Sequence, residues 1–179
     1  MIPPDRHPGS LTLITGGARG GKSAQAEKLV RLAGGQVVYV ATAEAGDDEM
    51  RTRIAAHKAA RPASWHTIEE PLHPSRRLAA AGAGTVLLDC LTLLVSNLLL
   101  AGEAIRAEID ALLAWQRASG ATLVVVSNEV GWGIVPDNPL ARRYQDELGW
   151  ANQRVAAAAN DVVLMVAGIP MPIKGAPAG

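Results

Sequence analysis

The chain has 179 residues, 49% of them apolar, equal numbers of acidic and basic side chains, and no phenylalanine. This length suits one domain with its own core, and a formal charge of zero argues against a broad nucleic-acid-binding face. The one cysteine, Cys90, cannot form an internal disulfide, which agrees with a reducing compartment. We therefore expect a cytoplasmic protein that binds no nucleic acid.

The two ends of the chain differ in composition from the rest. Residues 1–10 hold three prolines and no apolar core segment, so they predict a flexible N-terminal arm and not a signal peptide. We expect one folded domain over residues 11–174 and a C-terminal tail over residues 175–179. The apolar runs of this domain are too short or too polar to span a bilayer, so we expect no integral membrane segment.

The first predicted strand, Leu11–Thr15, runs directly into the pattern G-x-x-x-x-G-K-S at Gly16–Ser23. Glycines let successive backbone N–H groups face one anion, and the helix predicted over Lys22–Ala33 adds the positive end of its dipole. Lys22 is expected to reach the β- and γ-phosphates, and the Ser23 hydroxyl to bind Mg²⁺. A glycine-rich turn that only joins strand to helix is disfavoured, because the pattern is complete and correctly flanked. The segment predicts a nucleoside triphosphate site.

Strands and helices alternate along the remainder of the chain. Continuous apolar strands predict burial on both faces, as in a parallel sheet, so we expect a three-layer α/β sandwich of the P-loop NTPase class. Ligands of such sheets bind at the carboxyl ends of the strands. Further strands are predicted over Gln36–Ala41, Thr85–Asp89, Thr122–Ser127 and Asp161–Ala167, with a short one at His66, and helices over Asp47–Ala60, Leu91–Leu100, Glu103–Ala118 and Pro139–Ala159.

Polar residues follow two of these strands. Asp89 ends the strand Thr85–Asp89, where an acid in a P-loop domain usually orients Mg²⁺. The alternative is that Asp89 caps the helix that follows it. We favour the Mg²⁺ role, because a phosphate-binding loop requires a metal partner. After Thr122–Ser127, Asn128 and Glu129 are weaker candidates for the same site.

The helix predicted over Asp47–Ala60 carries a basic row. Arg53, His57 and Arg61 are spaced four residues apart, which places them along one side of a helix. Two guanidiniums flanking an imidazole suit anionic oxygens. From composition alone, however, the favoured interpretation is a solvated basic face with an incidental histidine.

Several motifs of this chain occur together, in one order, in a known family. With them, residues 11–174 closely resemble the bifunctional adenosylcobinamide kinase/adenosylcobinamide-phosphate guanylyltransferase family of cobalamin biosynthesis. The motifs are Thr15–Arg19, Tyr39–Thr42, Asp47–Met50, His57–Lys58, Arg61–Pro62, Asn128–Gly131, Gly133–Pro136, Asn138 and Asn152–Arg154.

The resemblance implies two reactions on a RecA-like domain that assembles as a homotrimer. ATP or GTP first phosphorylates a hydroxyl of adenosylcobinamide. GTP then gives GMP to an enzyme histidine, and adenosylcobinamide phosphate takes it up to form adenosyl-GDP-cobinamide. The motif match makes His57 this histidine, which reverses the preference for an incidental one, and Arg53 and Arg61 would offset the charge of the transferring group.

The resemblance also assigns site residues. His57 and Lys22 are the catalytic candidates, and Ser23 and Asp89 the candidate Mg²⁺ ligands. Relatives often carry Glu at the position of Asp89, so whether this shorter acid contacts metal or guanine stays open. The expected nucleotide contacts are Gly16, Gly17, Ala18, Arg19, Gly20, Gly21, Lys22, Ser23, Thr42, Ala43, Glu44, Lys58, Ala59, Ala60, Arg61, Glu69 and Asp89.

Three alternative functions compete with this one. A structural or partner-binding domain that keeps nucleotide only for stability would show no turnover with any corrinoid. A P-loop kinase for another small alcohol, without guanylyl transfer, would not need His57. A regulatory GTP-binding switch would read guanine with an N-K-x-D element, which the sequence lacks. Its only D-x-x-G match, Asp146–Gly149, falls inside a predicted helix, so we treat that match as chance.

Overall fold

The computed structural model describes residues 9–81 and 84–175. Residues 1–8 of the predicted arm and residues 176–179 of the predicted tail lie outside the described residues. One seven-stranded sheet has the order β3-β2-β4-β5-β1-β6-β7, parallel throughout except for the antiparallel β6–β7 pair. Its strands are β1 (Leu11–Gly16), β2 (Val37–Ala41), β3 (His66–Glu69), β4 (Thr85–Asp89), β5 (Thr122–Val126), β6 (Asp161–Val166) and β7 (Ile169–Lys174).

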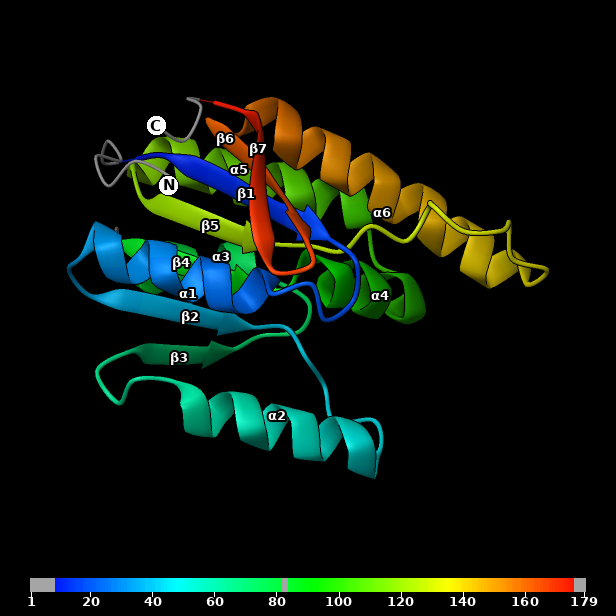
Figure 1. The fold of residues 1–179 in the computed structure, drawn as a ribbon, viewed down its shortest axis with the longest axis horizontal. Helices are drawn as coiled ribbons and strands as arrows, with labels where there is room; N and C mark the ends of the chain where they lie inside the picture. The colour runs from blue at the N-terminus through cyan, green and yellow to red at the C-terminus, as the bar shows by residue number, and fades with distance from the viewer. Residues whose placement is uncertain (1–8, 82–83, 176–179) are drawn as a thin grey trace.

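Helices cover both faces of this sheet (Figure 1). Side chains alternate between the faces along each strand, so Leu13 and Val125 join the core under α3–α6, whereas Ile14 and Val124 join the core under α1. Helix α2 lies beyond the β3 edge in this view, and most of its described side chains are exposed. The helices are α1 (Lys22–Ala33), α2 (Asp48–Ala60), α3 (Pro74–Ala81), α4 (Leu91–Ala101), α5 (Ile105–Ser119) and α6 (Pro139–Ala158).

The predicted three-layer sandwich with a mostly parallel sheet is confirmed. Every predicted helix and strand is present, with ends within two residues of the observed ones, and β3 is the short strand expected at His66. Asp146–Gly149 lies within α6, as predicted. Helix α3 and strand β7 were not predicted. No helix in the described ranges has the length and apolar character needed to cross a membrane.

The sheet brings the polar segments of the sequence to one edge. Strands β1, β2, β4 and β5 are parallel, and their pairing aligns Ala41 with Asp89, Asp89 with Val126, and Ile14 with Val126. The segments that follow these strand ends are therefore neighbours. Strand β5 lies between β1 and β4, so one strand separates the glycine-rich loop from the strand that carries Asp89.

Helix α6 begins at a well-formed N-cap, and this gives a stability prediction. Asn138 Oδ1 accepts hydrogen bonds from the N–H groups of Leu140 (2.8 Å) and Ala141 (3.4 Å), and Pro139 follows in the first turn. We expect Asn138→Ala to lower the free energy of unfolding by about 1 kcal/mol, measured by urea denaturation. The exposed neighbour provides a control, since Asp137→Ala should change it by less than about 0.5 kcal/mol; equal losses would contradict the capping role.

Candidate active site

The loop Gly16–Ser23 joins β1 to α1 with little space to spare. Gly16 has φ +138°, and a Cβ there would lie 2.5 Å from the carbonyl oxygen of Met165, so a side chain does not fit. Gly21, at φ +86°, is the N-cap of α1, and it provides no side-chain hydrogen bond to the helix. The first N–H groups of α1 thus have no capping side chain, which suits them to bind an anion.

Lys22 lies buried at the start of α1. Its Nζ donates a hydrogen bond to the carbonyl oxygen of Gly17 at 2.6 Å, inside the loop. Burial lowers the pKa of Lys22, while Cys90 and Asp89 act in the opposite direction. The sequence therefore places a largely desolvated amine where the loop would hold phosphates.

A cavity of about 920 Å³ opens beside this loop at the carboxyl ends of the strands. Its volume lies within the range of small-molecule sites. The structure brings most of the predicted site residues to this one cavity. Those that line it are Ala18, Arg19, Gly20, Gly21, Lys22, Ser23, Ala43, Glu44, His57, Lys58, Arg61, Glu69 and Asp89.

Other predicted contacts lie elsewhere. Gly16, Gly17, Thr42 and Ala59 are not part of this cavity wall, and the side chain of Ala60 lies outside the described part of the structure. Thr42 is fully buried, and its hydroxyl donates to the carbonyl oxygen of Cys90 (2.7 Å) and accepts from the N–H of Cys90 (2.8 Å). Thr42 thus joins the end of β2 to the end of β4, and its contact with a nucleotide stays a prediction.

The predicted basic row of α2 is interrupted at its C-terminal end. His57 is exposed on the helix and lines the cavity, and the side chain of Arg53 lies outside the described part of the structure. Helix α2 ends at Ala60, and Arg61 has extended backbone with φ −75° and ψ 143°. The four-residue spacing had suggested that Arg61 continues the row along the helix. Because the helix ends before it, Arg61 does not.

The guanidinium of Arg61 lies 3.7 Å from the centre of the Tyr39 ring. Its Nε and Nη1 atoms are buried, and neither has a hydrogen-bond partner among the described residues. A buried cation with unfilled donors is costly unless it is paired. Because Arg61 also lines the cavity, these donors suit an anionic ligand.

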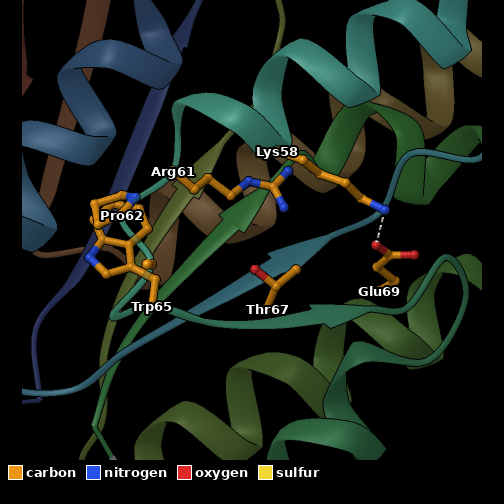
Figure 2. Close-up of a pocket in the computed structure, with 7 residues that line it drawn as sticks. Lys58, Arg61, Pro62, Trp65, Thr67 and Glu69 are labelled. Carbon is orange, nitrogen blue, oxygen red and sulfur yellow. Dashed lines mark ion pairs between the residues drawn. The ribbon is translucent and has the colours of Figure 1, made fainter.

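A smaller cavity of about 280 Å³ lies beside the end of α2, and Figure 2 shows the residues that line it. Lys58, Arg61 and Glu69 line both cavities, so the two are adjacent. Lys58 Nζ forms an ion pair with the Glu69 carboxylate, and both side chains are largely exposed. A phosphate entering here would compete with Glu69 for the Lys58 ammonium.

Asp89 lies at the cavity wall and accepts a hydrogen bond from the hydroxyl of Tyr39 at 2.7 Å. Burial raises the pKa of Tyr39, and the charge of Asp89 raises it further, so the hydroxyl keeps its proton and acts as the donor. The N-cap of α4 is Cys90, which provides no side-chain hydrogen bond to that helix. The alternative in which Asp89 caps α4 is therefore not the arrangement observed.

The two predicted Mg²⁺ ligands, Ser23 and Asp89, line the same cavity. A hydroxyl and a carboxylate oxygen are donors that Mg²⁺ accepts, and Mg²⁺ commonly combines one or two such ligands with substrate phosphates and water. Across residues 9–81 and 84–175, no group of three or more His, Cys, Asp or Glu residues could hold a metal on its own. The residues present thus fit a cation that arrives with the nucleotide.

The two candidates after β5 lie in different places. Asn128 lines the cavity, whereas Glu129 accepts a hydrogen bond from the Thr15 hydroxyl at 2.8 Å.

Sequence reasoning missed other parts of the cavity wall. Burial raises the pKa of the Cys90 thiol to about 11, so this thiol is not a nucleophile at neutral pH. Lining residues without a predicted role include Tyr39, Met50, Ile54, Pro71, Cys90, Thr92 and Leu93.

These features define a class of protein first. A glycine-rich loop between β1 and α1, an acid at the end of β4 and a cavity at the carboxyl ends of parallel strands together make a P-loop NTPase domain. A solved KaiC-like protein from Pyrococcus horikoshii shares this fold with a TM-score of 0.54 at 18% identity, over 88% of this chain and 71% of that one. That likeness concerns the fold alone.

Sequence comparison gives the family. The family model described as cobinamide kinase / cobinamide phosphate guanyltransferase matches residues 12–173, and the chain belongs to this family. It is similar to the bifunctional adenosylcobalamin biosynthesis protein CobP of Pseudomonas aeruginosa, with 50% identity over 92% of this chain and 98% of that protein. The corresponding CobU of Salmonella typhimurium is 46% identical, over 92% of this chain and 99% of that protein.

Family membership confirms the resemblance that the motifs indicated. The chain is an enzyme of a bifunctional family that combines kinase and guanylyltransferase activities. A P-loop kinase without guanylyl transfer and a regulatory GTP-binding switch are both disfavoured by this result.

Proposed function

We propose that this chain performs both reactions of its family at the cavity beside the glycine-rich loop. ATP or GTP phosphorylates adenosylcobinamide, and GMP then passes from GTP through His57 to adenosylcobinamide phosphate, giving adenosyl-GDP-cobinamide. The observation that supports this proposal is that His57, Lys22, Ser23 and Asp89 line one cavity although they come from separate segments.

In the kinase step the chain mainly positions phosphates and offsets their charge. The loop N–H groups and the start of α1 hold the triphosphate, and Lys22 exchanges its bond with the Gly17 carbonyl oxygen for one with a phosphate oxygen. Mg²⁺ held by Ser23, Asp89 and the phosphates would neutralise part of the charge. Arg61 offers its two unfilled donor atoms to the same anion.

In the guanylyl-transfer step His57 is the nucleophile. An imidazole nitrogen attacks the α-phosphorus of GTP, the bond from that phosphorus to the bridging oxygen breaks, and pyrophosphate leaves. GMP is then held on the enzyme through a P–N bond. The phosphate of adenosylcobinamide phosphate attacks the same phosphorus, and the imidazole leaves more readily because it takes up a proton.

We also propose that the enzyme is a homotrimer in the cytoplasm. Support for association comes from the exposed apolar segment between β5 and α6, in which the exposed fractions of Trp132, Ile134 and Val135 are 76%, 95% and 70%. Exposed apolar groups of this size commonly mark contact surfaces, and the mass of the protein in solution tests this proposal. The lone cysteine agrees with a reducing compartment.

The decisive test of the proposed function is the mass of the intact protein after incubation with GTP and Mg²⁺. We expect a GMP-sized, acid-labile adduct, because a P–N bond to imidazole hydrolyses readily in acid, and we expect adenosylcobinamide phosphate to discharge it. ATP in place of GTP is the control for base selectivity. Absence of any adduct would instead support a kinase that lacks guanylyl transfer.

A further inference from the structure

Tyr39 and Asp89 lie on neighbouring strands and on the same face of the sheet. In the β2–β4 register Tyr39 pairs with Leu87, and Ala41 pairs with Asp89. Tyr39 is therefore the diagonal neighbour of Asp89, two residues before the end of β2. The Tyr39 hydroxyl reaches forward and donates to Oδ2 of Asp89 at 2.7 Å. One of the two carboxylate oxygens is thereby fixed from within the sheet.

The ring that carries this hydroxyl is held in place. Tyr39 is 2% exposed, the Trp65 ring stacks near it with centroids 6.2 Å apart and planes at 26°, and the Arg61 guanidinium lies 3.7 Å from its centre. Packing of this kind leaves a tyrosine little freedom about its side-chain torsions. The hydroxyl thus has a defined position relative to Asp89.

We propose that Tyr39 is a positioning residue, whose hydroxyl orients the Asp89 carboxylate toward the divalent cation that accompanies the nucleotide. This inference rests on the proposed function, in which Asp89 and Ser23 hold Mg²⁺ beside the phosphates. With Oδ2 engaged by Tyr39, Oδ1 would be the oxygen that binds the cation. Groups that orient metal ligands in this way typically change metal affinity by about 10- to 100-fold.

The test measures binding of a fluorescent GTP analogue as Mg²⁺ is added, and it needs no catalytic turnover. Tyr39→Phe keeps the ring and removes only the hydroxyl. We expect this variant to bind the nucleotide normally without Mg²⁺, and to need about tenfold more Mg²⁺ to reach half of the Mg²⁺-dependent increase in affinity.

A matched control exists because the chain has one other tyrosine. Tyr144 donates to the carbonyl oxygen of Thr92 at 3.3 Å, and it lies outside the cavity wall. Tyr144→Phe removes the same group from a half-buried site elsewhere, and we expect it to respond to Mg²⁺ as the parent does. An equal shift in both variants would overturn the proposal.

A double-mutant cycle shows whether Tyr39 acts through Asp89. If it does, Tyr39→Phe should cause no further change in the Mg²⁺ requirement of an Asp89→Asn protein, whereas a merely structural hydroxyl would cost the same in both backgrounds. An unchanged Mg²⁺ requirement in Tyr39→Phe overturns the proposal. A changed preference of Tyr39→Phe for GTP over ATP without Mg²⁺ would also overturn the proposal, because Asp89 would then contact the base instead of the cation.

The outcome is separable from that of the proposed function. A parent protein that binds nucleotide with Mg²⁺ but forms no GMP adduct would contradict the guanylyl-transfer step and still allow the Tyr39 test. A parent whose nucleotide binding does not respond to Mg²⁺ overturns the positioning role directly.

Discussion

Replacing His57 with alanine should abolish the GMP adduct while leaving nucleotide binding and most of the kinase rate. His57 is an exposed side chain on α2, so its removal takes nothing from the core. In the proposed mechanism this imidazole attacks the α-phosphorus, so we expect guanylyl transfer to fall at least about 10³-fold, as when a catalytic nucleophile is removed. Intact-protein mass after incubation with GTP, together with a separate ATP-dependent kinase assay, measures both effects.

The matched control is His66→Ala. His66 is also exposed, lies on β3, and is not part of the cavity wall. This variant should form the adduct as the parent does. A persistent adduct in His57→Ala would assign the nucleophile to another residue, and loss of nucleotide binding in that variant would give His57 a binding role instead of a chemical one.

The parts of the fold that sequence predicted well are those governed by local pattern. Strand β1, the glycine-rich loop and α1 form one contiguous signal. Helix α3 was missed, and part of what holds its start is a side chain distant in the sequence. Glu108, on α5, accepts hydrogen bonds from the N–H group (2.9 Å) and the hydroxyl (3.0 Å) of Ser75 at the start of α3. Nothing in the residues around Ser75 shows this contact.

Strand β7 was missed for a different reason. Pro170 and Pro172 lack the N–H that a central strand needs, so a run containing both is usually excluded from a sheet. In this fold β7 is the edge strand, and among the described strands it pairs with β6 alone. The chemistry of proline is compatible with that place, but the sequence does not reveal which strand becomes the edge.

The residues of the candidate site also differ in whether a local sequence signal reveals them. The glycine-rich loop and Asp89 could be predicted, because each carries its own signal at a strand end. Tyr39 could not, because it reads as one more buried residue of an apolar strand. Its relation to Asp89 appears only when the register aligns Ala41 with Asp89. The position of Arg61 likewise depends on where α2 ends. The four-residue spacing of the basic row did not predict that the helix ends before Arg61.

Replacing Lys22 with alanine should slow both reactions at least about 10²-fold, the scale of losing one preorganised donor to a developing charge. Lys22 is 7% exposed and already points into the loop, so its ammonium needs little rearrangement to reach a phosphate. In the proposed function, both reactions begin with a triphosphate in the same loop. Initial rates of adduct formation and of phosphorylation, measured at saturating nucleotide, should therefore fall together.

Lys28→Ala provides the control, because Lys28 is an exposed lysine on the same helix. Its rates should equal those of the parent, and a thermal unfolding curve for each variant separates catalysis from loss of structure. Near-normal turnover in Lys22→Ala would refute the assignment of the loop. If only one reaction slowed, the two triphosphates would have to bind at different places, and the single cavity shared by Lys22 and His57 would no longer account for both activities.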